Sequence, residues 1–182
     1  MEKTVIAYYT GTGNTLELAK RIKEAELVDI IKINEGNATL DDDITRLGIF
    51  FPVYMGGVPY PVREFISNTL NGRDNSSLQY VFSLITCGSG GKNAEWMLDR
   101  SLQDIGIGLS YALSIRYPDS YLPLVSKVPD ENKTKEILGK AEEKKFAGYR
   151  SAVDKILPLL RDGKCARQTE LTEEQMAGIY DL

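Results

Sequence analysis

Short apolar runs alternate with amphipathic stretches along almost the whole chain. Runs rich in β-branched and aromatic residues predict strands, because such side chains pack well on a pleated surface. One of these runs, LGIFFPV, is apolar without interruption, as in parallel strands that are covered on both faces. The five expected strands are Thr4–Tyr9, Leu27–Ile33, Leu47–Val53, Tyr80–Thr86 and Leu109–Tyr117.

The stretches between these runs carry apolar residues at helical spacing. Pro61 is expected to begin one helix, which Asn71 and the following glycine end. Asn93 is expected to cap another helix, and Pro158 to limit the last one. The four expected helices run over Asn14–Lys23, from Pro61 to Asn71, from Asn93 to Ile105, and from about Asp130 to Leu157.

Strands that alternate with crossover helices predict one parallel sheet with helices on both faces, which is a doubly wound α/β fold. The pattern covers residues 1–162 as a single domain, and the polar residues 163–182 are expected to form a C-terminal tail. Ligands bind to such sheets at the carboxyl ends of the strands. The loops after the first, third, fourth and fifth strands are therefore the candidates for a site.

Composition narrows the chemistry that such a site could perform. The 182 residues include no histidine, which argues against His-containing triads and most zinc sites, and Cys87 and Cys165 match no metal-binding spacing. No metal site is therefore expected. A formal net charge of −4 argues against nucleic-acid binding. Two thiols without a leader sequence suggest the cytoplasm, and no apolar run approaches the ~18–20 residues that a membrane span needs.

The stretch YTGTGNT lies between the first expected strand and the first expected helix. A turn there exposes backbone N–H groups at the positive end of a helix dipole, which suits phosphate. The loop lacks the lysine of a triphosphate-binding loop, and Leu16 replaces the third glycine of a dinucleotide fingerprint. Neutral donors around two glycines favour a single monophosphate. These residues are Thr10, Gly11, Thr12, Gly13, Asn14 and Thr15.

The string T-x-T-G-N-T formed by these six residues resembles the phosphate loop of flavodoxins. The resemblance implies FMN as the cofactor, bound through its ribityl phosphate, and a flavodoxin-like sheet with the strand order 2-1-3-4-5. Together with the segment PVYMGGVPYP, it is similar to the flavodoxin domains of flavodoxin–ferredoxin fusion proteins, as far as about Leu160. The cysteine-rich clusters of those fusions are not present in this sequence.

The loop after the third strand is implied to pack on one face of the flavin ring. Its candidate residues are Pro52, Val53, Tyr54, Met55, Gly56 and Gly57. Met55-Gly56 resembles the Met-Gly pair of short clostridial flavodoxins, in which a glycine peptide rotates to bond the reduced ring, so Gly56 is the candidate for that role. Gly57 departs from the acidic residue usual in that group. Because fewer negative charges then oppose reduction, we expect a less extreme second potential.

The loop after the fourth strand is implied to approach the pyrimidine edge of the flavin through Thr86, Cys87, Gly88, Ser89 and Gly90. Ser89 stands where flavodoxins commonly have a stacking aromatic residue. Trp96 is expected to pack on the following helix, and Cys87 to close the strand as a small residue. The segment after the fifth strand, which includes Tyr121, is a candidate lid over the outer flavin face.

One site of this kind could serve two functions. The first is a flavodoxin-like carrier that passes single electrons between redox partner proteins, ferredoxin-like or reductase-like. The second is an FMN-dependent NAD(P)H:quinone-type reductase acting on a small acceptor, which an open flavin face at Ser89 would suit. A module that binds a phosphate compound without redox chemistry is a third. Nothing in the sequence resembles a nicotinamide site, so the sequence favours the carrier over a substrate-specific oxidoreductase.

Overall fold

The computed structural model of the protein describes residues 2–34, 38–88, 90–116 and 131–162. A five-stranded sheet in the order β2-β1-β3-β4-β5 runs through these residues, and all pairs of neighbouring strands are parallel. The doubly wound fold class and the expected strand order are therefore confirmed. The strands are β1 (Thr4–Tyr8), β2 (Asp29–Lys32), β3 (Arg46–Pro52), β4 (Tyr80–Cys87) and β5 (Tyr111–Arg116).

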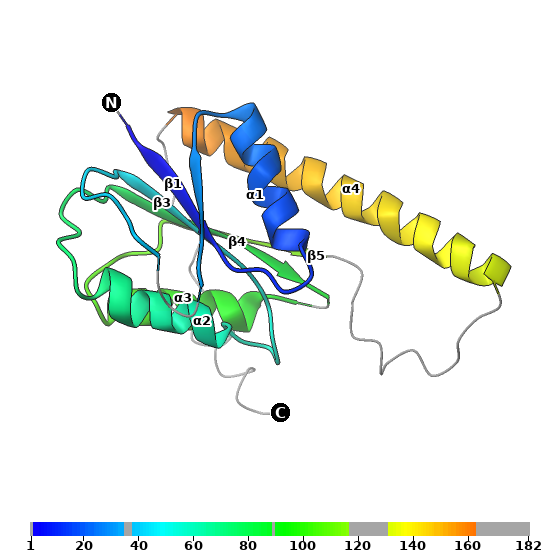
Figure 1. The fold of residues 1–182 in the computed structure, drawn as a ribbon, viewed down its shortest axis with the longest axis horizontal. Coiled ribbons are helices and arrows are strands. Elements are labelled where there is room, and N and C mark those ends of the chain that lie inside the picture. The colour runs from blue at the N-terminus through cyan, green and yellow to red at the C-terminus, as the bar shows by residue number, and fades with distance from the viewer. Residues whose placement is uncertain (1, 35–37, 89, 117–130, 163–182) are drawn as a thin grey trace.

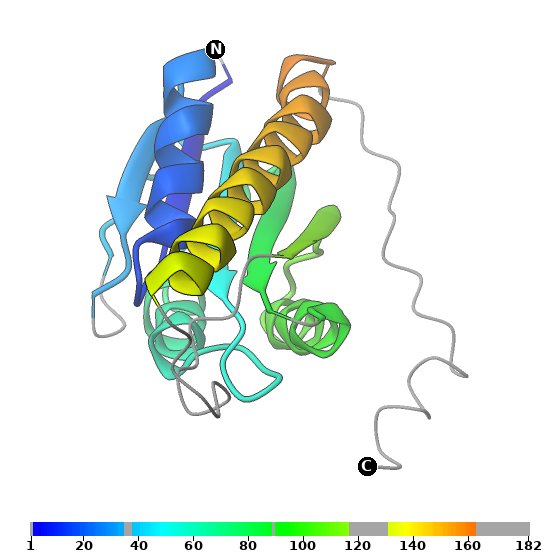
Figure 2. The same ribbon diagram turned by 90° about the vertical axis from the view of Figure 1, so that its right-hand side faces the viewer.

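Helices cover both faces of this sheet. They are α1 (Asn14–Ala25), α2 (Tyr60–Glu64), its π-helical continuation η1 (Phe65–Leu70), α3 (Lys92–Gln103) and α4 (Glu131–Asp162). Helices α1 and α4 lie on one face, and α2 and α3 on the other (Figures 1 and 2). None of the helices in the described ranges is both long enough and apolar enough to cross a membrane.

The core consists of two layers separated by the sheet, because successive side chains of a strand point to opposite faces. In β1, Val5 and Ala7 pack toward α2 and α3, whereas Ile6 and Tyr8 pack toward α1 and α4. All eight residues of β4 are buried, as expected for a central strand with helices on both sides. The uninterrupted apolar runs of the sequence follow from this double coverage.

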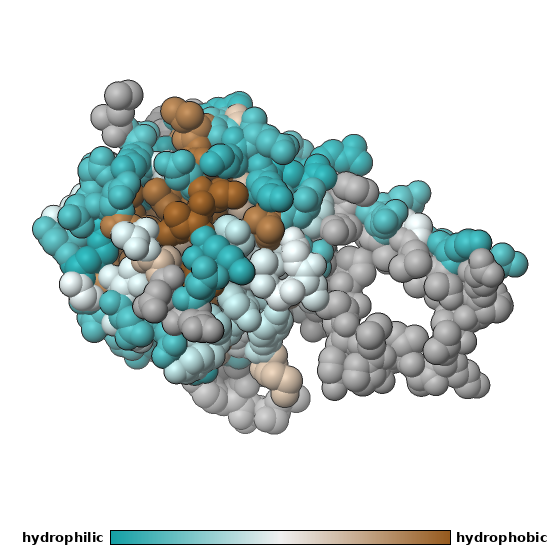
Figure 3. Space-filling model, in the orientation of Figure 1, coloured by the Kyte–Doolittle hydropathy of each residue, from teal (hydrophilic) through white to brown (hydrophobic). Residues whose placement is uncertain are grey.

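Strand β2 is shorter than the predicted Leu27–Ile33, because the chain enters the sheet only at Asp29. Leu27 is fully exposed and precedes the strand. Strand β2 lies at the edge of the sheet, and its Ile30 and Ile31 are only half-buried. Figure 3 shows hydrophobic residues gathered on this side of the molecule, over the sheet edge where β2 lies in Figure 1. The fifth strand also begins later than predicted, at Tyr111.

Helix α4 continues through Pro158, so the predicted end at Leu157 is wrong. Proline cannot donate a hydrogen bond to the carbonyl one turn earlier, which usually stops a helix. The last turn of α4 is instead held by contacts with the rest of the domain. Leu160 is buried, and its carbonyl accepts a hydrogen bond from Nη1 of the buried Arg46.

Candidate functional site

The predicted phosphate loop joins β1 to α1 at the carboxyl edge of the sheet. Gly13 is the N-cap of α1 with a φ of 90°, in the left-handed region that favours glycine. Its N–H donates to Oγ1 of Thr10 at 3.0 Å, which closes the loop. Of the two loop glycines, Gly13 has positive φ, whereas Gly11 lies outside the left-handed region.

The start of α1 directs backbone donors toward this loop. The first hydrogen bond of the helix runs from the Glu17 N–H to the Gly13 carbonyl, at 2.9 Å. Within the described helix, the N–H groups of Asn14, Thr15 and Leu16 precede that bond and have no partner in the helix ladder. Thr12 is exposed, and its Oγ1 accepts from the Asn14 side chain at 3.5 Å. The loop thus combines the positive end of a helix with neutral side-chain donors.

Thr15 differs from the other loop residues because its side chain is fully buried. Its hydroxyl forms a hydrogen bond with the hydroxyl of Thr86 at 3.1 Å. Thr86 itself lies opposite Pro52 in the sheet, and its carbonyl accepts from the Val53 N–H at 2.8 Å. These contacts bring together residues that the sequence assigned to three different loops.

A tight turn follows β3 and is closed by two hydrogen bonds between Tyr54 and Gly57. The Tyr54 N–H donates to the Gly57 carbonyl at 3.2 Å, and the Gly57 N–H donates to the Tyr54 carbonyl at 2.9 Å. The residues between them have positive φ, 49° at Met55 and 77° at Gly56, as in a type I′ turn. Met55 is the only non-glycine residue with positive φ in the described ranges. Backbone strain of this kind is concentrated at functional sites.

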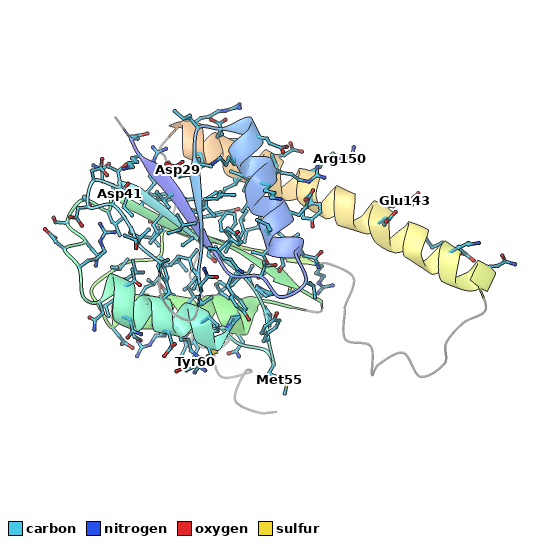
Figure 4. The ribbon with its side chains drawn as sticks, viewed as in Figure 1. Asp29, Asp41, Met55, Tyr60, Glu143 and Arg150 are labelled. Atoms are coloured by element: carbon cyan, nitrogen blue, oxygen red, sulfur yellow. The ribbon has the colours of Figure 1, made fainter. Side chains whose placement is uncertain are left out.

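The Met55 side chain is fully exposed and points away from the body of the molecule (Figure 4). Tyr54 is half-exposed at 43%, and its ring lies edge-on to that of Tyr9, with 6.0 Å between the ring centroids. Partial burial is the main cause that raises the pKa of Tyr54, and the neighbouring Tyr9 raises it further. The Tyr54 hydroxyl oxygen lies only 2.0 Å from the position that a Cβ at Gly11 would occupy. The turn after β3 is therefore in direct contact with the phosphate loop.

Asn93 does not have the capping role that the sequence predicted. Gly91 takes the N-cap position of α3, and Asn93 lies in the first turn of the helix. The Asn93 amide Nδ2 instead donates to the Gly56 carbonyl at 2.8 Å and lies 3.8 Å from the Met97 sulfur. The capping prediction is wrong because this side chain is directed across to the turn after β3.

Met97 lies close to position 57. Gly57 is buried, and a Cβ built on it would lie 3.0 Å from the Met97 sulfur. A side chain at this position would therefore require the Met97 thioether to move. Helix α3 thus contacts both Gly56, through Asn93, and Gly57.

Two of the residues predicted for the loop after β4 belong to the strand itself. Thr86 and Cys87 are the last residues of β4 and are buried, whereas Gly88 and Gly90 are exposed. The Cys87 thiol lies 3.6 Å from the Ile115 carbonyl, and burial raises its pKa, as expected for a small residue that closes a strand.

Trp96, the residue predicted to pack on the helix after β4, lies half-buried on α3. Ser89, Tyr121 and the candidate lid from residue 117 onward lie outside the described residues.

Helix α4 contributes a residue that the sequence pattern did not reveal. The fully buried Tyr149 directs its hydroxyl to the Asn14 carbonyl at 3.3 Å, and the Arg21 guanidinium lies 5.1 Å from the centroid of its ring. The first turn of α1 is therefore supported from behind by α4. In the sequence, the only signal at Tyr149 is the apolar spacing that is common to helices.

A cavity of about 840 Å³ lies at the opposite edge of the sheet, where β3 and β4 begin. Arg46, Tyr80 and Ser110 are among its lining residues. Because doubly wound sheets bind ligands at the carboxyl ends of their strands, we place the candidate site at the phosphate loop and not in this cavity.

The sequence matches no family model, and no curated protein matches it. Similar structures are known, however. A WrbA-like flavodoxin from Agrobacterium tumefaciens is 18% identical, with 85% of this chain and 99% of that one covered at a TM-score of 0.54. A flavoprotein in complex with FMN from Lactobacillus acidophilus is also 18% identical, with 70% and 100% covered at a TM-score of 0.52. This chain has a flavodoxin-like fold.

The same fold forms part of a longer protein. Rubredoxin oxygen:oxidoreductase from Desulfovibrio gigas is 12% identical, and the match covers 86% of this chain and 37% of that one at a TM-score of 0.51. At these identities the comparisons establish the flavodoxin-like fold alone.

Proposed function

We propose that this protein binds FMN at the carboxyl edge of its sheet and passes single electrons between redox partner proteins. The phosphate loop carries the proposal. It combines a left-handed glycine N-cap, helix N–H groups without ladder partners in the described helix, and neutral hydroxyl donors. That donor set fits one monophosphate, and the structurally similar flavoprotein bound to FMN supports the choice of flavin.

Three segments of this chain would bind FMN. The hydroxyls of Thr10 and Thr12 and the first amides of α1 would hold the phosphate. The turn Tyr54–Gly57 would line the ring, and the exposed backbone at Gly88 and Gly90 would approach its pyrimidine edge. When bound, FMN supplies the one-electron chemistry, and the protein sets access and potential. The partners are ferredoxin-like or reductase-like proteins.

Comparing FMN with riboflavin tests the phosphate loop directly, because the two ligands differ only in the phosphate. Hydrogen bonds to charged groups contribute about 1.5–3 kcal/mol each, so two of them predict at least about 100-fold tighter binding of FMN. Fluorescence titration of each ligand measures the ratio. Equal affinities, or no binding of FMN, would contradict the proposal.

Stopped-flow reduction distinguishes the carrier from the alternative reductase. A carrier is reduced by a redox protein and only slowly by NADPH or NADH. Rapid direct reduction of the FMN-loaded protein by either nucleotide would instead favour an NAD(P)H:quinone-type reductase.

A further inference from the structure

The peptide between Gly56 and Gly57 is bound on both sides by the protein itself. Its carbonyl accepts from Asn93 Nδ2 at 2.8 Å, and its N–H donates to the Tyr54 carbonyl at 2.9 Å. Both polar groups of this peptide therefore have partners within the chain.

This peptide is also the part of the turn that can most easily change orientation. It lies between two glycines, which have no Cβ to restrict rotation. The preceding peptide is more restricted, because Met55 carries a Cβ and already has a φ of 49°. Rotation of the Gly56–Gly57 peptide would break both of its hydrogen bonds. Asn93 is the side chain that opposes this rotation.

The support for Asn93 is rigid. The helix that carries it, α3, is anchored in the core by the fully buried Ala94, Leu98 and Leu102. Met97, one turn beyond Asn93, places its sulfur 3.8 Å from the Asn93 amide and against Gly57. The same helix face therefore contacts both residues of the rotating peptide.

We propose that Asn93 is a positioning residue that holds the Gly56–Gly57 peptide toward α3 and thereby makes the first reduction of bound FMN less favourable. The inference rests on the proposed function. Once free of Asn93, the Gly56 carbonyl can accept a hydrogen bond from a ring N–H. Bound FMN would present such an N–H only in its reduced form, for which a redox partner protein would supply the electron and water the proton. The Asn93 hydrogen bond competes with this new one.

The ligand-free protein tests whether Asn93 holds the peptide. Amide hydrogen exchange at Gly57, followed by NMR, is compared in the wild type, Asn93→Ala and Asn93→Asp. Loss of one hydrogen bond, about 1 kcal/mol, predicts exchange about fivefold faster in both variants. Aspartate preserves the side-chain size and is favourable in the first turn of a helix, so faster exchange in both variants cannot come from fraying of α3. Unchanged exchange in both would overturn the inference.

The FMN-loaded protein tests the effect on reduction. Asn93→Ala should raise the equilibrium constant of the first one-electron step about five- to tenfold, and tenfold corresponds to about 59 mV. Lys92→Gln, at the exposed neighbouring residue, is the matched control and should not raise it. A first potential in Asn93→Ala equal to that of the control would overturn the inference. If the wild type failed to bind FMN, the proposed function would fail, whereas the exchange experiment would still report on Asn93.

Discussion

The hydroxyl oxygen of Tyr54 lies 2.0 Å from the position that a Cβ at Gly11 would occupy. This contact joins the two loops that would hold opposite ends of FMN. Any side chain at position 11 would have to displace the Tyr54 hydroxyl, which lies in the space beside this glycine. The geometry of the phosphate loop and that of the turn after β3 are therefore coupled through one residue pair.

Gly11→Ala is expected to weaken FMN binding about tenfold. The added methyl group overlaps the Tyr54 hydroxyl, and overpacking of this kind costs about 1–3 kcal/mol. Removal of the oxygen in the double variant Gly11→Ala/Tyr54→Phe should restore most of the affinity. Gly139→Ala is the control, because Gly139 lies on α4 with open space around it. Fluorescence titration with FMN measures all of them, and a failure of Tyr54→Phe to restore binding would contradict the explanation.

Gly57→Asp is expected to destabilise the protein by about 1–3 kcal/mol, because the new Cβ would lie 3.0 Å from the Met97 sulfur. Met97→Ala makes room for it, so the double variant should be less destabilised than the sum of the two single variants. Urea unfolding of the four proteins measures the coupling energy. Strict additivity would show that Met97 does not exclude a side chain at position 57.

The same double variant tests the expectation that Gly57 makes the second potential less extreme. The added carboxylate should lower that potential, because it opposes the negative charge of the fully reduced ring. A redox titration of the FMN-loaded proteins measures the shift. A very low second potential in the wild type would contradict the expectation.

Met55→Asn is expected to stabilise the fold and weaken FMN binding at once. Met55 has a φ of 49° and buries nothing, while Asn-Gly is a preferred pair for a type I′ turn. The change should therefore raise the free energy of unfolding by about 0.5–1 kcal/mol. The apolar thioether offered to the flavin is lost. Urea unfolding of the ligand-free protein and FMN titration measure the two effects, and a destabilised variant would contradict the assigned turn.

The fold and the phosphate loop could be predicted because their signals are local. The apolar runs of β1, β3 and β4 reflect coverage on both faces, and the strand–loop–helix order around the loop glycines was visible in the sequence. These features depend on residues adjacent in sequence. Burial and backbone sterics cause these features, and both produce patterns that are visible in the sequence alone.

The contacts that shape the ring end could not be predicted, because their partners are far apart in sequence. The local sequence predicts Asn93 as a helix cap, whereas its amide donates to the Gly56 carbonyl, 37 residues away. Tyr149 reaches the Asn14 carbonyl across 135 residues. Pro158 stays in a helix only because tertiary contacts hold the turn that follows it. Each of these positions has an ordinary local interpretation that packing overrides.

Cys87 is expected to react slowly with iodoacetamide at neutral pH. Burial raises its pKa, and nearby Glu95 acts in the same direction while Arg116 opposes it, so the thiol stays protonated. Alkylation at pH 8 should be at least about tenfold slower than in urea, and should accelerate only as the pH rises toward the raised pKa. Peptide mass spectrometry distinguishes Cys87 from Cys165. Equal rates in the folded and unfolded protein would contradict the buried placement.

The hydrogen bond between Thr15 and Thr86 is expected to matter most when only one partner is removed. Both side chains are buried, so Thr86→Val leaves the Thr15 hydroxyl without its partner and should cost about 1–3 kcal/mol. The double variant Thr15→Val/Thr86→Val removes both polar groups at nearly constant volume and should cost less than either single change. Urea unfolding of the four proteins closes the cycle. Since the pair joins the first turn of α1 to the end of β4, the single variant should also weaken FMN binding. The double variant should weaken it less. If the double variant were as unstable as the sum of the single ones, the two hydroxyls would not depend on each other.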